Sequence, residues 1–151
     1  MLLVVFCELV CSCTSRREEI TKVVSANNKY VVEIKPLKTS KSGDSILSYI
    51  IHITAQDLKG LFGDTLKIRG VEKRKYYFDY HFGKDITLEQ DGQLYSPKSF
   101  HFEAGSSISN KYNFFVFFKV PRTKEVFKRK IIINSPVLVS ETLNFILATN
   151  N

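Results

Sequence analysis

The three cysteines are the strongest potential nucleophiles of the chain, and all of them lie within its first 13 residues. Cys7, Cys11 and Cys13 could hold a metal, form a disulfide or accept a covalent group. No later cysteine and no nearby histidine completes a metal site, so we expect neither a metal nor another cofactor. The rest of the chain has no thiol, and its folded part must therefore be stable without disulfides.

The residues before and after Cys13 differ sharply in polarity. Residues 1–6 are apolar, and the polar stretch 14–19 directly follows Cys13. Between them, Val10-Cys11-Ser12-Cys13 places an aliphatic residue and a small residue ahead of the last cysteine. This segment resembles the lipobox of bacterial lipoproteins of the Bacteroidetes type.

The resemblance implies how the chain is processed and where in the cell it is located. Residues 1–12 would be a signal peptide cut after Ser12, and the sulfur and amine of Cys13 would carry acyl chains such as palmitate. The mature protein would then be anchored by lipid in the cell envelope, at the outer membrane, facing either the periplasm or the surface. An ordinary buried strand over residues 2–6 is the alternative. A transmembrane helix is not expected, because it needs about 20 apolar residues and Glu8 interrupts this run.

Composition favours one domain built from strands. The 151 residues are 44% hydrophobic, with 12 Phe, 7 Tyr and no Trp, and this richness in aromatic residues is typical of sheets. The net charge of +7 can favour an anionic partner or simply keep the protein soluble. For an exported protein we expect no nucleic-acid partner. We divide the chain into a signal peptide (1–12), an acylated cysteine with its tether (13–28) and a β-sandwich domain (29–151).

Short segments with alternating polarity follow one another along the domain. A short strand at Val23 and Val24 is also possible inside the tether. Residues 55–62 read as one or two helical turns, and Asp91-Gly92 predicts a tight hairpin turn. Residues 141–148 fit either a strand or a helix. The expected strands are 30–35, 46–54, 75–82, 85–89, 93–95, 99–103, 112–120 (placed centrally, because both of its faces are apolar) and 126–134.

These segments predict an all-β fold, an antiparallel sandwich of about 7–9 strands with one short helical turn. Residues 114–123 (FFVFFKVPRT) resemble a strand of immunoglobulin-type lipoprotein domains that ends in a Val-Pro step. The resemblance implies an immunoglobulin-like order of strands.

The most polar part of an aromatic segment supplies the candidate site. If residues 75–82 form a strand, Tyr77, Asp79 and His81 share one face, and Tyr76, Phe78, Tyr80 and Phe82 share the other. We expect the second set to be core, which makes Tyr77 the exposed aromatic residue of a speculative ligand site with Asp79 and His81. The last two could begin a hydrolase dyad, but Ser106 and Ser107 lack the turn that a nucleophile needs.

The histidines and the basic runs could form binding sites, but both groups can also be explained as ordinary surface residues. His52, His81 and His101 could meet as a zinc site, but each sits where alternation places an outward polar residue. Residues 73–75 and 128–130 are basic runs that fit an anionic partner. They equally fit charges that protect edge strands from aggregation, the reading we favour for 128–130.

These observations predict a lipid-anchored envelope protein with a non-enzymatic binding or scaffolding role. The alternatives are a carbohydrate-binding accessory module and a subunit of an envelope secretion or gliding assembly. Its partners would be membrane lipid, through acylated Cys13, and a protein or a glycan.

Overall fold

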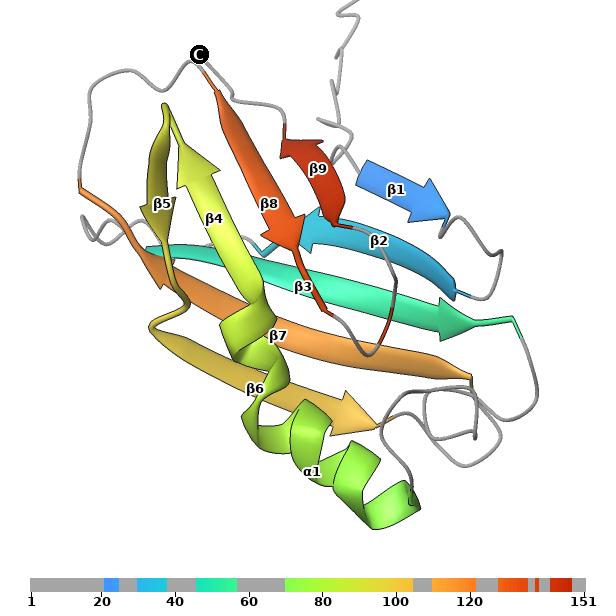
Figure 1. Ribbon diagram of the computed structural model, residues 1–151. Helices are drawn as coiled ribbons and strands as arrows, with labels where there is room; N and C mark the ends of the chain where they lie inside the picture. The colour runs from blue at the N-terminus through green and yellow to red at the C-terminus, as the bar shows by residue number, and fades with distance from the viewer. Residues whose placement is uncertain are drawn as a thin grey trace, which may run out of the picture.

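The structure, a computed structural model, describes residues 21–24, 30–37, 46–56, 70–104, 110–121, 128–135, 138 and 142–147. Strands dominate these residues, and one α-helix and one short 3-10 helix interrupt them (Figure 1). In chain order the elements are β1 (Thr21–Val24), β2 (Tyr30–Pro36), β3 (Ile46–Ala55), α1 (Val71–Tyr80), the 3-10 helix η2 (Phe82–Asp85), β4 (Ile86–Gln90), β5 (Gln93–Tyr95), β6 (Ser99–Ala104), β7 (Lys111–Lys119), β8 (Arg129–Ile133) and β9 (Leu143–Leu147).

The strands form two antiparallel sheets with an immunoglobulin-like order. One sheet runs β1-β2-β3-β7-β6, and the other runs β5-β4-β8-β9. If β2 to β9 are taken as A, B, C, C′, D, E, F and G, the sheets read A-B-E-D and C′-C-F-G, with β1 added at one edge. The predicted antiparallel sandwich is therefore confirmed, and α1 lies in the connection between B and C.

Strands with a clear period of two were predicted correctly. In β3, Tyr49, Ile51 and Ile53 point into the core, and His52 lies on the other face. The predicted central strand is β7, which pairs with β3 on one side and β6 on the other. The last segment is the strand β9, and the short strand expected at Val23 and Val24 is β1.

The hairpin between β4 and β5 turns on Asp91 and Gly92, as predicted. Both residues have positive φ, 49° and 85°, which is what a two-residue turn of the primed type requires. The side chain of Asp91 also accepts a hydrogen bond from the Lys128 amide at 2.8 Å, which ties the turn to the start of β8.

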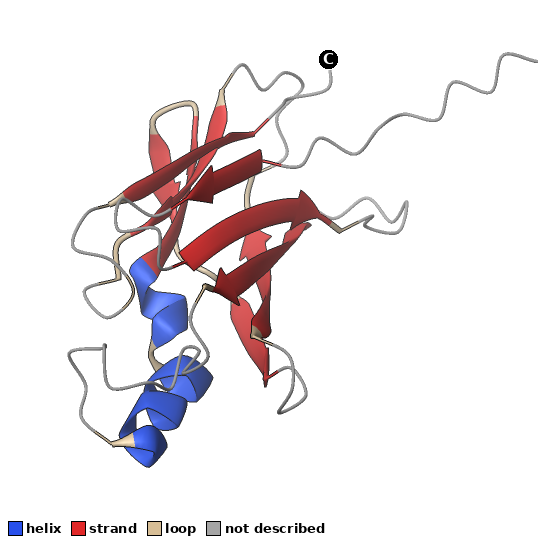
Figure 2. Cartoon of the chain, turned by 90° about the vertical axis from the view of Figure 1, so that its right-hand side faces the viewer, coloured by secondary structure: helices blue, strands red, loops and turns tan. Residues whose placement is uncertain are grey.

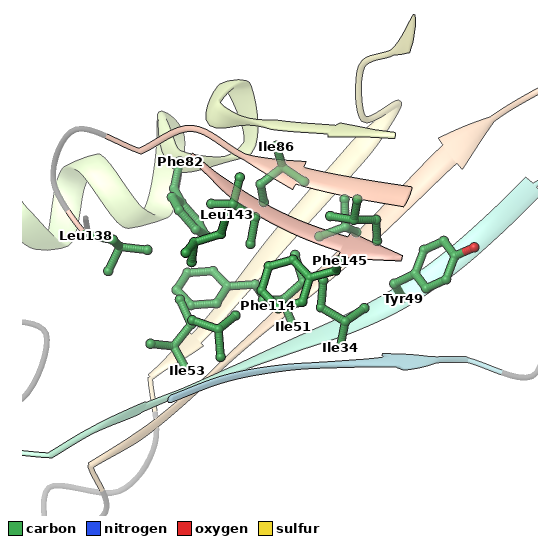
Figure 3. Packing of buried hydrophobic residues seen from close by; sticks show 14 of the residues in the cluster. Ile34, Tyr49, Ile51, Ile53, Phe82, Ile86, Phe114, Leu138, Leu143 and Phe145 are labelled. Carbon is green, nitrogen blue, oxygen red and sulfur yellow. The ribbon is translucent and has the colours of Figure 1, made fainter. Parts of the chain in front are cut away.

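The core between the sheets is built from isoleucine and phenylalanine (Figure 3). An immunoglobulin domain of an antibody places a disulfide and a tryptophan there, and no described strand of this chain carries either residue. Phe114 of β7 takes the centre, with ring centroids 4.7 Å from Phe82 and 4.8 Å from Phe102. Dense aromatic packing thus stabilises the contact between the sheets in the place where a disulfide lies in antibody domains.

The prediction of a strand over residues 75–82 is wrong. Val71–Tyr80 is the helix α1, and Phe82–Asp85 is the 3-10 helix η2. The alternating aromatic residues mimic a strand, but Phe78 of α1 and Phe82 of η2 are spaced by four, and their ring centroids lie 5.5 Å apart. Both are fully buried against the end of the sandwich. The tertiary contacts of these two rings therefore outweigh the β-propensity of the tyrosines.

Replacing Phe114 with alanine should lower the free energy of unfolding by about 3–5 kcal/mol, because a fully buried ring is lost from the centre of the aromatic cluster. Phe117→Ala is the matched control, since its ring is only half-buried on the outer face of the same strand. Urea denaturation of both variants measures the difference. Equal losses would contradict the central role of Phe114.

Candidate functional site

Helix α1 begins at a glycine and lies at one end of the sandwich (Figures 1 and 2). Gly70 has φ +89°, a conformation that other residues rarely adopt, and its carbonyl accepts the Arg74 amide at 3.2 Å. Glu72 lies in the first turn, where a negative charge is favoured by the helix dipole. The His81 amide donates to the Tyr77 carbonyl at 2.8 Å, and the chain then tightens into η2.

The inner face of α1 packs the helix against the five-stranded sheet. The Phe78 ring lies 6.0 Å from Phe102 and 5.9 Å from Phe114, measured between centroids. Arg74, in the middle of the first basic run, is also buried on this face, and Lys73 and Lys75 are exposed. Helical geometry explains the difference, because successive residues of a helix point in different directions.

Tyr77, expected to be exposed, is half-buried and joins α1 to the ends of two strands. Its hydroxyl donates to the carboxylate of Asp85 and lies 2.7 Å from Oγ of Ser135, just after β8. The Ser135 hydroxyl must donate to the phenol oxygen, because the phenol proton is already given to Asp85. Burial, the largest cause, and the Asp85 carboxylate both raise the pKa of Tyr77 above its usual value near 10, and the bond from Ser135 opposes them.

The outer face of α1 carries the exposed aromatic residues. Tyr76 and Tyr80, expected to be core, are 58% and 67% exposed. They are four residues apart on the helix, and their ring centroids are separated by 4.9 Å with a tilt of 43° between the rings. The His81 ring lies 5.2 Å from the Tyr76 ring, so three aromatic side chains gather on this face.

A shallow groove of about 670 Å³ runs along the same face. Its described lining combines rings with charged groups of both signs. The lining residues are Glu72, Lys73, Lys75, Tyr76, Tyr77, Asp79, Tyr80 and His81. All three residues of the predicted ligand site are therefore brought together, and Tyr76 and Tyr80 are the two that the strand interpretation missed.

Asp79 and His81 do not have the relation that the sequence suggested. Asp79 is in the last turn of α1 and His81 directly follows the helix, where positions two apart do not face one another. Both line the groove, and the described lining contains no serine, threonine or cysteine. Ser106 and Ser107, the serines that lack the sequence of a nucleophile turn, are outside the described residues.

The three histidines occupy separate places in the fold. His52 Nδ1 lies 2.7 Å from Oδ1 of Asn113, within the five-stranded sheet. His101, on β6, lies 3.7 Å from the carboxylate of Glu103. Among the described residues, no three His, Cys, Asp or Glu side chains are grouped as metal ligands.

The second basic run does not protect an edge, because β8 lies between β4 and β9. The preferred reading of residues 128–130 is thus wrong. Arg129 points to Gln90 and donates to Oε1 from Nε and Nη2 at 3.2 and 2.9 Å. Lys130 is on the outer face, 2.8 Å from the Glu89 carboxylate.

Several expectations concern residues outside the described ranges: the lipobox with Ser12 and Cys13, a strand over 2–6, and most of the helical turn expected over 55–62. Among the residues that the structure describes, no helix is both long and apolar enough to cross a bilayer. No family model matches the chain, and no curated protein or solved structure is significantly similar to it.

Tyr77→Phe should lower the free energy of unfolding by about 1–3 kcal/mol at neutral pH, because the hydrogen bond to the Asp85 carboxylate is lost. The folded protein holds the phenol proton more tightly than the unfolded chain does. The stabilisation by Tyr77 is therefore complete below a pH of about 10 and declines above it.

Chemical denaturation at neutral and alkaline pH tests this coupling. The difference in stability between the parent and Tyr77→Phe should shrink as the pH rises past about 10. Tyr76→Phe, which alters a mostly exposed phenol on the same helix, is the control and should show little effect at either pH. A Tyr77→Phe difference that stays constant with pH would refute the argument.

Proposed function

We propose that this chain is a non-enzymatic binding protein of the bacterial cell envelope, anchored by acyl chains on Cys13 and using α1 as its recognition surface. The observation that supports a binding role is the pair of exposed tyrosines beside the groove. Large amphipathic rings are the side chains that most often carry binding energy at recognition surfaces. Asp79 and His81 serve in this proposal as polar contacts to the ligand.

The contacts on the inner face of α1 support this role, because they fix the orientation of the helix and therefore of its outer face. Phe78 is buried among rings of both the helix and the sheet, and Tyr77 is bonded to Asp85 and Ser135. A helix held in this way presents Tyr76 and Tyr80 in a fixed relation. Little conformational entropy is then lost when a ligand binds.

The anchor and the recognition surface are compatible in space. The eight peptide steps from Cys13 to Thr21 can span at most about 28 Å, so the domain would stay close to the bilayer. Helix α1 lies at the end of the sandwich away from β1, the strand that the tether enters (Figure 1). The groove would thus project away from the membrane.

A scaffolding role is the second candidate, supported by the outer face of the β5-β4-β8-β9 sheet. Leu94 and Ile146 are 64% and 68% exposed there, in one row with the ion pair between Glu89 and Lys130. Apolar side chains around a polar pair fit a protein contact. Co-purification from native membranes that is lost in Leu94→Glu would favour this role.

Mass spectrometry of the mature protein from its native membrane tests the anchor. We expect an N-terminal Cys13 that carries acyl chains, and we expect Cys13→Ala to leave the detergent phase, because at least two chains are needed for firm anchoring. Cys11→Ala is the matched control and should remain in detergent. A Cys13→Ala variant that partitions as the parent does would disprove the anchor.

A further inference from the structure

We infer that the groove on α1 binds a neutral saccharide, with the apolar face of a sugar ring stacked on Tyr76 and Tyr80. This inference rests on the proposed role of α1 as a recognition surface. The two tyrosine rings are more than half exposed, and their centroids are 4.9 Å apart with a tilt of 43°, so each ring leaves part of its surface open to a sugar ring. The C–H groups on one face of a pyranose carry partial positive charge, which suits the negative face of such rings.

The described lining of the groove combines ring surface with polar groups, which suits a ligand that has both characters. Its described side chains are all charged or aromatic with a polar group, and no aliphatic side chain is among them. A purely apolar ligand would cover these described charged groups without offering them a hydrogen-bond partner. A sugar presents both an apolar face and hydroxyl groups, and this combination matches the lining.

The charges of the lining argue against a polyanion. Lys73 and Lys75 are balanced by Glu72 and Asp79, although the whole chain has a net charge of +7. An acidic glycan or a nucleic acid gains affinity from an excess of positive charge, which the described lining residues do not supply. Neutral hydroxyl groups, in contrast, can donate to the carboxylates and accept from the lysines.

The tilt of the rings indicates which form of saccharide fits. The planes of Tyr76 and Tyr80 meet at 43°, and His81 adds a third ring, tilted by 54° from Tyr76. A flat crystalline polysaccharide would need coplanar rings to lie on. An angled surface fits the twisted backbone of a soluble oligosaccharide better.

Isothermal titration of the folded full chain with neutral hexasaccharides tests the inference. The panel is maltohexaose, cellohexaose, laminarihexaose, xylohexaose and mannohexaose, with heparin as the polyanion. We expect at least one neutral hexasaccharide to bind, and we expect Tyr76→Ala and Tyr80→Ala each to weaken that binding roughly tenfold. Tyr76→Phe and Tyr80→Phe keep the ring and should weaken it much less.

Val71→Ala is the matched control, because Val71 is exposed on the same helix and is not among the residues that line the groove. It should bind as the parent does. Circular dichroism of every variant checks the fold, and these exposed positions are not needed for packing. Three results would each overturn the inference: no binding to any neutral hexasaccharide, binding that both alanine variants retain, or a preference for heparin that Lys73→Gln and Lys75→Gln abolish.

Photo-crosslinking separates this inference from the proposed function. With p-benzoylphenylalanine in place of Tyr80, the protein in its native envelope should crosslink to a glycan. A crosslink to a protein, without saccharide binding, would overturn the saccharide inference and leave α1 as the recognition surface. No crosslink and no saccharide binding would overturn both.

Discussion

The packing of Phe78 and Phe82 against Phe114 is the interaction on which the rest of the structure depends. These rings join the connection between the two sheets to the centre of the core. Once they are buried, the rotation of α1 about its own axis is fixed, because residues on a helix keep constant angular positions. Tyr76 and Tyr80 must then face solvent, and Tyr77 must face Ser135. One aromatic contact thus determines both the stability of the fold and the direction in which its candidate site points.

The sandwich also shows how the immunoglobulin order is kept without its usual cross-link. Strands β3 and β8 occupy the places of B and F, and both contribute isoleucine to the core. The hydrogen bonds of Tyr77 with Asp85 and Ser135 lie at the end of the sandwich where β4 begins and β8 ends. Burial and polar closure together supply the constraint that a disulfide supplies elsewhere.

The sequence predicted the strands well where polarity alternates and both neighbours are strands, as in β3 and β7. It failed at residues 75–82, because tyrosine and phenylalanine alternate there with a period of two. The preceding Glu72–Lys75 run is rich in helix formers, and Phe78 and Phe82 are spaced by four, so a helical signal was present. The candidate site was located in the correct segment, but the faces were exchanged. The Ser135 contact could not have been found, since it joins residues 58 positions apart.

Strand β1 has a mechanical consequence for a domain that is held from its N-terminal side. Among the described residues, four pairs join β1 to β2 at the edge of the sheet. Tension that arrives through the preceding residues therefore acts first on these pairs and on the contacts of β1 with β9. Their release would add residues 21–29 to the tether, up to about 30 Å, and leave the two-sheet order of β2 to β9 intact. A force on the tether would in this way detach the edge strand β1 before it disturbs the core or helix α1.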